Sequence, residues 1–185
     1  LTKKDTLDSF FDNTENATIF HLAGLIHPGT WIKPIYSVNQ NGSRNILDKA
    51  IESSCKRIIA VSSNSPIGTN PSNDHLFDET SPYNPYMAYG KSKMAMEKMI
   101  NDAFSLGKIA TVILRPCWFY GPDQPPRQTL FFNMIKNGKA PIVGGGNSKR
   151  SMSYVDNTCQ AILLSSNNKK ANGQTYWIAD EKPYT

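Results

Sequence analysis

The sequence has few cysteines, no long apolar run and little net charge, and each shortage excludes a class of protein. Its three cysteines, Cys55, Cys117 and Cys159, form no CxxC pair. A disulfide framework or a structural zinc site is therefore not expected, and a reducing cytoplasm is the default location. No apolar run approaches the about 20 residues that cross a bilayer, so no membrane segment is expected. The start, Leu-Thr-Lys-Lys-Asp, lacks an initiator methionine and a signal-peptide pattern, as an internal segment would.

The charge excess is small and scattered along the chain. Twenty Lys and Arg residues stand against 15 Asp and Glu residues among 185, which gives a formal net charge of +5. No basic stripe with interleaved aromatic residues is present, so a nucleic-acid partner is the weakest interpretation. A small anionic molecule suits this charge better. The 39% hydrophobic content is that of a globular protein.

Short apolar runs alternate with amphipathic segments, which is typical of a parallel sheet with crossover helices. Three segments are predicted to be buried strands: 18–23, 57–62 and 110–115. Two longer segments are predicted to be helices: about 34–50 and 87–104. Between them, residues 63–85 are rich in Ser, Asn, Pro and Gly and predict a long loop. Loops of this length usually line functional sites.

Beyond residue 115, the glycine and proline residues that mark turns are spaced less regularly. Short helices near 130–137 and 156–166 and a strand at 175–179 are predicted there. The predicted fold class is α/β, with a partial Rossmann-like, doubly wound parallel sheet and part of a small α+β substrate-binding region.

The sharpest chemical feature is the pair Tyr89 and Lys93, a YxxxK motif on a predicted helix. Four-residue spacing places the phenol and the ammonium on one helix face. A free phenol has a pKa near 10, and a nearby ammonium would lower this pKa toward the range of a useful acid/base. The alternative is a half-buried tyrosine beside a solvated lysine.

Two predicted strand ends carry further polar candidates. Ser63 follows the strand 57–62, where its hydroxyl would orient a substrate oxygen, or would only satisfy nearby backbone. His21 and Gly24 close the first strand, and Gly24 allows a ligand to approach the backbone. No Cys, Asp or Glu cluster accompanies His21, His27 or His75, so no metal is assigned.

Two other features have bland interpretations. Gly144–Gly146 lacks the GxxxxGK[ST] pattern of a phosphate loop and predicts a turn. Cys117 follows a strand and is expected to be a buried thiol rather than a nucleophile.

Six motifs in order resemble the extended short-chain dehydrogenase/reductase family, also called the NAD-dependent epimerase/dehydratase family. They are HLAG (21–24), VNQNGSRNIL (38–47), VSSNSPIG (61–68), PYMAYGKSK (85–93), LRPCWFYGP (114–122) and RSMSYVDN (150–157). The resemblance implies NAD or NADP as the cofactor and a small-molecule substrate. It is also compatible with a homodimer.

The resemblance also implies roles for individual residues. The residues implied to be catalytic are Ser63, Tyr89 as acid/base, Lys93 and Asn39. Those implied to bind the cofactor are Ala23, Gly24, Tyr89, Lys93 and Pro116. Those implied to bind substrate are Ser63, Trp118, Arg127 and Arg150, of which Arg150 matches an arginine that contacts substrate phosphates.

Two departures from the family pattern qualify these expectations. The glycine-rich GxxGxxG loop is absent from residues 1–185, so 1–115 is interpreted as an incomplete NAD(P)-binding core that lacks its first βαβ unit. Residues 116–185 are then part of a substrate-binding region. Trp118 stands where sugar-nucleotide enzymes tend to have Asn, which keeps a hydroxysteroid- or flavonoid-type ketone reductase open beside a nucleotide-sugar enzyme. A non-catalytic dinucleotide sensor is the third alternative.

Overall fold

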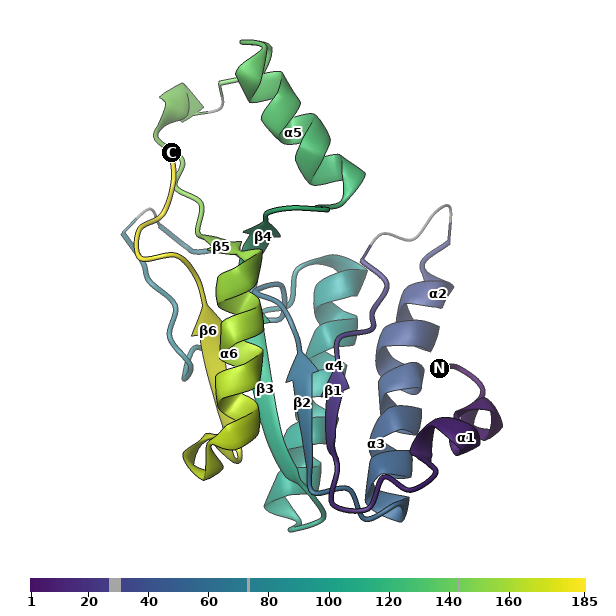
Figure 1. The fold of residues 1–185 in the computed structure, drawn as a ribbon. Coiled ribbons are helices and arrows are strands. Elements are labelled where there is room, and N and C mark those ends of the chain that lie inside the picture. Colours follow the sequence, from purple (N-terminus) through teal and green to yellow (C-terminus); the bar gives the residue numbers. More distant parts are fainter. Residues whose placement is uncertain (27–30, 73, 143) are drawn as a thin grey trace.

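Four parallel strands form the central sheet of the computed structural model, which describes residues 1–26, 31–72, 74–142 and 144–185 (Figure 1). The strands lie in the order β1-β2-β3-β6. Their bounds are β1 Thr18–His21, β2 Arg57–Val61, β3 Ala110–Pro116 and β6 Gln174–Ile178. Every neighbouring pair is parallel. Their carboxyl ends therefore meet at one edge of the sheet.

Helices cover both faces of this sheet. On one face, α3 (Ser43–Glu52) and α4 (Met87–Ser105) pack against Ile58 and Ala60 of β2. On the other, α6 (Val155–Asn167) packs against Ile59. Successive side chains of a strand point to opposite faces, so β2 is apolar throughout because both of its faces are covered. The predicted doubly wound, Rossmann-like α/β fold is confirmed.

The remaining elements are short, and several of them were not predicted. The helices are α1 (Asp8–Phe11), α2 (Lys33–Tyr36) and α5 (Pro126–Lys136), and the two strands of a second parallel sheet are β4 (Trp118–Tyr120) and β5 (Met152–Tyr154). Single 3₁₀ turns lie at Lys4–Leu7, Gly144–Gly146 and Lys169–Ala171. The turn at Gly144–Gly146 agrees with the prediction made there.

The helix predicted at 34–50 differs in one respect. Between α2 and α3 the chain forms a π-helical segment, Ser37–Gly42, which buries Asn39. Such segments within a helix are rare and occur frequently at functional sites. β1 also ends earlier than predicted, because its pairing with β2 stops at His21.

The sheet also extends beyond the predicted division of the chain after residue 115. β6 pairs with β3, with Thr175 opposite Ile113, and α6 packs on β2 and β3. The chain thus passes through the region of β4, α5 and β5 and then returns to the sheet. In Figure 1, that region lies above the carboxyl ends of the strands.

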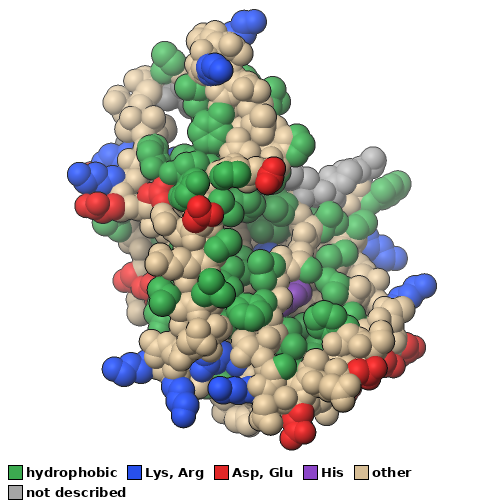
Figure 2. Space-filling model, viewed as in Figure 1, with side chains coloured by type: hydrophobic (Ala, Val, Ile, Leu, Met, Phe, Trp, Pro, Cys, Tyr) green, Lys and Arg blue, Asp and Glu red, His purple; other side chains and the backbone are tan. Residues whose placement is uncertain are grey.

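The face covered by α6 remains partly apolar at its surface. Figure 2 shows apolar side chains gathered over it, and the exposed ones include Phe20 of β1 and Leu163 and Leu164 of α6. Within the described ranges, no helix combines the length and apolar character needed to cross a membrane.

Candidate functional site

The carboxyl edge of the sheet collects the predicted residues that follow β1, β2 and β3. Ala23 and Gly24 follow β1 and are exposed, whereas Ser63 follows β2 and Pro116 ends β3, and both are buried. In open α/β sheets, ligands bind outside this edge. The fold thus brings the backbone at Gly24, the hydroxyl of Ser63 and the ring of Pro116 to the edge of the sheet where a ligand is expected.

α4 adds Tyr89 and Lys93 to the same edge. The helix begins at Met87, so both residues lie in its first two turns, one helical turn apart. A Cβ on Gly90 would lie 2.5 Å from the Ser65 carbonyl oxygen, so glycine alone allows this close approach of α4 to the loop after β2. That approach places Ser63 close enough to the Tyr89 phenol to favour its ionised form. Ser63 Oγ also donates to Asn64 Oδ1 at 3.2 Å.

The pKa of Tyr89 moves in the opposite direction from the prediction. Burial raises the pKa of the phenol, and the nearby Ser63 hydroxyl opposes this rise without cancelling it. The Lys93 ammonium, which was expected to lower this pKa, donates instead to the Val61 carbonyl oxygen at 3.0 Å. Burial also lowers the pKa of Lys93 to about 8, against the opposing charge of Glu97.

Asn39 holds two parts of the site together. Its Oδ1 accepts from Leu25 N at 2.7 Å, and its Nδ2 donates to Leu25 O at 2.9 Å and to Ser92 Oγ at 3.0 Å. Ser92 in turn donates to the Tyr89 carbonyl oxygen at 2.8 Å. The buried amide therefore connects the segment after β1 to the turn of α4 that carries Tyr89, and its contacts are those of a positioning residue.

His21 is a core histidine, as predicted. Its Nε2 lies 2.7 Å from Ser43 Oγ, and Ser43 Oγ donates to the Asn39 carbonyl oxygen. Because the Ser43 hydrogen is used there, Nε2 carries the ring hydrogen and the imidazole is neutral. Burial, and then the charge of Lys93, lowers the pKa of His21 to about 4.

The predicted substrate residues lie in the region of β4, α5 and β5. The Arg150 guanidinium lies over the Trp118 indole at 5.2 Å, and Phe131 and Phe132 contact the same indole. Arg127 lies at the surface of α5. The structure therefore brings Trp118 and Arg150 together, although they were predicted to favour different substrates.

Sequence reasoning missed Glu97 of α4 and its two partners. Glu97, four residues after Lys93, is fully buried and paired with Arg115 of β3, and Tyr83 donates to the same carboxylate. The spacing of Glu97 from Lys93 was the available signal. Nothing in the sequence distinguishes Glu97 from a solvated helix residue.

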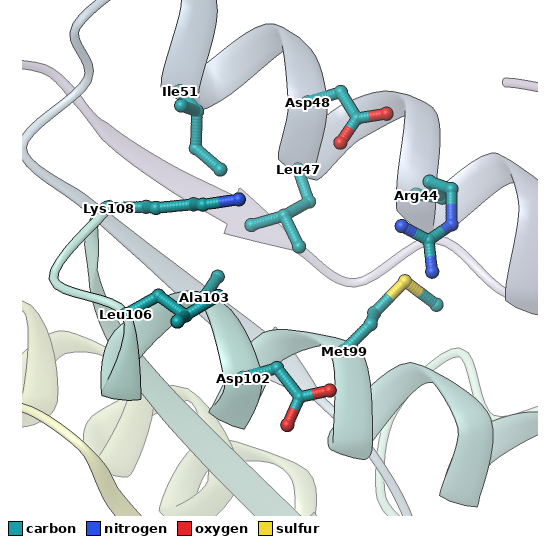
Figure 3. Close-up of a pocket in the computed structure, with 9 residues that line it drawn as sticks. All are labelled: Arg44, Leu47, Asp48, Ile51, Met99, Asp102, Ala103, Leu106 and Lys108. Carbon is teal, nitrogen blue, oxygen red and sulfur yellow. The ribbon is translucent and has the colours of Figure 1, made fainter.

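Other features lie apart from this edge. A cavity of about 190 Å³ lies between α3 and the carboxyl-terminal half of α4, and neither Tyr89 nor Lys93 lines it. Figure 3 shows the residues that line it. Its lining residues are Arg44, Leu47, Asp48, Ile51, Met99, Asp102, Ala103, Leu106 and Lys108.

Cys117, which follows β3, is buried and free. Burial, and then the charge of Asp180, raises the pKa of its thiol to about 11, as suits an inert thiol. In the described part of the chain, no group of His, Cys, Asp and Glu is suited to hold a metal; His27 lies outside it.

A family model agrees with the motifs and the fold. The model described as "NAD dependent epimerase/dehydratase family" matches residues 1–179. The chain belongs to this family. An uncharacterized protein, y4nL of Sinorhizobium fredii, is 44% identical over 100% of the chain and 52% of its own length. The chain therefore spans about half the length of this relative.

Relatives with named activities differ in substrate. The N-acetyl-α-D-glucosaminyl-diphospho-ditrans,octacis-undecaprenol 4-epimerase of Escherichia coli O157:H7 is 30% identical over 79% of the chain and 44% of its own length. The 3β-hydroxysteroid-dehydrogenase/decarboxylase isoform 1 of Arabidopsis thaliana is 30% identical over 80% and 36%.

The fold has close structural likenesses in this family. The solved dTDP-glucose 4,6-dehydratase of Bacillus anthracis, in complex with NAD, matches with a TM-score of 0.84 at 21% identity, over 100% of this chain and 58% of that one. A likeness at this identity supports the fold alone.

Proposed function

We propose that the protein carrying this chain is an NAD(P)-dependent epimerase, dehydratase or oxidoreductase that acts at a secondary alcohol or its ketone. The observation that carries the proposal is the placement of Tyr89 and Lys93 on successive turns of α4 at the carboxyl edge, beside Ser63 at the end of β2. This arrangement supplies a proton-transfer group, a hydroxyl that orients the substrate oxygen, and a cation.

The residues beside Lys93 fit a dinucleotide. A Cβ on Gly24 would lie 3.2 Å from Lys93 Nζ and 3.4 Å from Asn39 Oδ1, so glycine leaves a slot beside the ammonium. Of the three N–H donors of Lys93, one is used on Val61 O and one is directed at Met96 Sδ, which leaves a donor for a ribose hydroxyl. Ala23, Gly24 and Pro116 would line the bound cofactor, which supplies hydride acceptance and return.

Proton transfer at the substrate oxygen is the task of Tyr89. The raised pKa of its phenol keeps the proton on Oη, which suits donation to a carbonyl oxygen as a ketone is reduced. In the reverse direction, the phenolate that remains after this donation receives the proton of the alcohol. Ser63, which follows β2 beside Tyr89, would hold the substrate oxygen in place.

A nucleotide sugar is the substrate class that we favour. Guanidinium groups bind phosphate oxygens in a bidentate fashion, and Arg150 is held at the surface over Trp118. Arg127 of α5 is a second candidate cation. The relative that acts on a diphosphate-linked sugar supports this class.

A hydroxysteroid-type substrate is the second candidate. Two observations favour it: the aromatic cluster of Trp118, Phe131 and Phe132, and the similarity to the plant hydroxysteroid relative.

A cytoplasmic location and a homodimer stay predictions from the sequence. The three cysteines are free in the structure.

The test uses the complete protein with NAD or NADP and two substrate panels, nucleotide sugars and hydroxysteroids. Formation of reduced nicotinamide and of sugar products is followed. Tyr89→Phe should lower turnover by about 10²–10⁴-fold with little change in dinucleotide affinity. Tyr86→Phe, at an exposed tyrosine three residues earlier, is the matched control. Near wild-type turnover in Tyr89→Phe would refute the mechanism, and dinucleotide binding without turnover on either panel would favour the sensor.

A further inference from the structure

A fully buried carboxylate lies on the same helix as the proposed acid/base pair. Glu97 has no exposed surface, and Arg115, itself 3% exposed, contacts it through two nitrogens. Arg115 Nε lies 3.1 and 3.2 Å from the two carboxylate oxygens, and Nη2 lies 2.7 Å from Oε2. Tyr83 OH donates to Oε2 at 2.9 Å. Three elements, the loop before α4, α4 itself and β3, are thus joined at one carboxylate.

Glu97 also faces Lys93 along the helix. Residues four apart on a helix have Cβ atoms about 5–6 Å from each other on one face. Lys93 is 3% exposed. Its ammonium donates to the Val61 carbonyl oxygen at 3.0 Å and to Met96 Sδ at 3.9 Å, and neither acceptor carries a charge. Glu97 is the group whose negative charge favours the ammonium form of Lys93.

The other groups around Lys93 do not supply a negative charge. His21 of β1 is neutral and donates to Ser43, and Tyr89 keeps its phenolic proton. Asn39 presents an uncharged amide oxygen near Nζ. Arg115 of β3 is positive and reaches this region through Glu97.

We propose that Glu97, fixed by Arg115 and Tyr83, is a positioning residue that keeps the Lys93 ammonium charged and directed at Val61 O, beside Tyr89. The inference rests on the proposed function for the role of Lys93 in turnover. A buried carboxylate with three donors is a fixed charge, because its side chain has no freedom to move toward solvent.

The loop that connects Ser63 to Tyr89 is anchored to the same unit. The Arg115 guanidinium lies 5.6 Å from the ring centroids of both Tyr83 and Trp177. Phe77 of the loop stacks on Trp177 at 6.1 Å, and Trp177 N donates to Glu79 Oε1 at 3.2 Å. Both contacts connect the loop to β6. Glu97 of α4 therefore contacts both the loop, through Tyr83, and the sheet, through Arg115.

A purely structural ion pair is the competing explanation, and it makes a different prediction. Buried pairs can often be replaced by apolar residues of similar volume without loss of stability. The double substitution Glu97→Met with Arg115→Met removes both charges and leaves no unpaired ion. Glu97→Gln removes the carboxylate charge alone. If the pair serves only stability, neither change should alter the protonation of Lys93.

The experiment measures the titration midpoint of Lys93 by NMR of ¹³C-labelled lysine in the complete protein, assigned with Lys93→Arg. We expect Glu97→Gln to lower this midpoint by about one pH unit or more, as loss of an opposite charge at this range does. The double variant also loses the Arg115 cation, so its midpoint should fall by less. Asp102→Asn, an exposed carboxylate on the same helix, is the matched control and should not shift it. In turnover assays, the alkaline limb of the pH profile should move to lower pH by a similar amount.

The outcomes separate the inference from the proposed function. An unchanged Lys93 midpoint in folded variants overturns the positioning role, whether or not the protein is active. Loss of the fold in both variants, seen by circular dichroism, also overturns it, since Glu97 is then a stability residue. A lowered midpoint in a protein without dehydrogenase or epimerase activity supports the positioning of Lys93 and refutes the proposed function.

Discussion

Acid should destabilise this protein through one buried residue, His21. The imidazole is 3% exposed, and its Nε2 lies 2.7 Å from Ser43 Oγ. Its pKa is lowered from 6.5 to about 4, chiefly by burial and then by the charge of Lys93. Between these two values the unfolded chain binds a proton at this position and the folded chain does not. Stability is therefore fully present above pH 6.5 and falls as the pH falls toward 4.

The magnitude follows from the two pKa values. Each pH unit of difference corresponds to 1.36 kcal/mol, so the lowering from 6.5 to about 4 gives a loss of about 3 kcal/mol at the acid end. This is a large fraction of the about 5–15 kcal/mol that holds an ordinary protein folded. This loss of unfolding free energy comes from the proton that the unfolded chain binds at His21, so it occurs even if the contacts of the core stay the same.

The assay is chemical unfolding of the complete protein, followed by tryptophan fluorescence, from about pH 4 to pH 7. His21→Gln retains an N–H donor for Ser43 but cannot titrate, so its stability should vary less with pH than that of the wild type. The difference between the two curves isolates His21 from the carboxylates that also titrate in acid. His75→Gln, at an exposed histidine, is the control and should follow the wild type. Identical acid dependence in the wild type and His21→Gln would refute the reasoning.

Three further predictions concern other sites. Gly24→Ala would place a Cβ 3.2 Å from Lys93 Nζ, so dinucleotide binding, measured by calorimetry, should weaken more than the fold does; unchanged affinity would argue against the slot. Arg57 is 2% exposed, and its guanidinium donates to two carbonyls at the end of α6, so Arg57→Met should cost about 2 kcal/mol in unfolding experiments; a neutral effect would remove its capping role. For a nucleotide sugar, Arg150→Ala should raise KM strongly and added salt should weaken binding; loss of activity only in Trp118→Ala would instead favour a steroid.

The first three strands of the sheet could be predicted because each contains a short, mostly apolar run. β2 reads Arg-Ile-Ile-Ala-Val, and burial of both faces is what such a run indicates. The π-helical segment could not be predicted, because its residues continue the apolar spacing of a helix. β4 and β5 are three residues each and pair across more than 30 positions, so neither has a local pattern that identifies it.

The sequence could name candidate site residues where their chemistry is local, and it missed residues whose importance depends on burial. Tyr89 and Lys93 form a motif within one helix, and the comparisons leave their roles as proposals. Glu97 and Arg115 are 18 residues apart and look like solvated charges in the sequence. The predicted pKa of Tyr89 had the wrong direction for the same reason, because proximity to Lys93 was visible in the spacing but burial was not.

The contact between Trp118 and Arg150 changes how the substrate question is argued. In the sequence, the tryptophan favours a flat apolar substrate and the arginine favours phosphates, and the two count against each other. In the structure the guanidinium lies 5.2 Å from the indole, an arrangement that holds an exposed cation in a fixed orientation. An indole that supports an arginine and contacts Phe131 and Phe132 presents less free surface to a substrate. Trp118 is thus no longer independent evidence against a nucleotide sugar, because its contacts serve the residue proposed to bind the diphosphate.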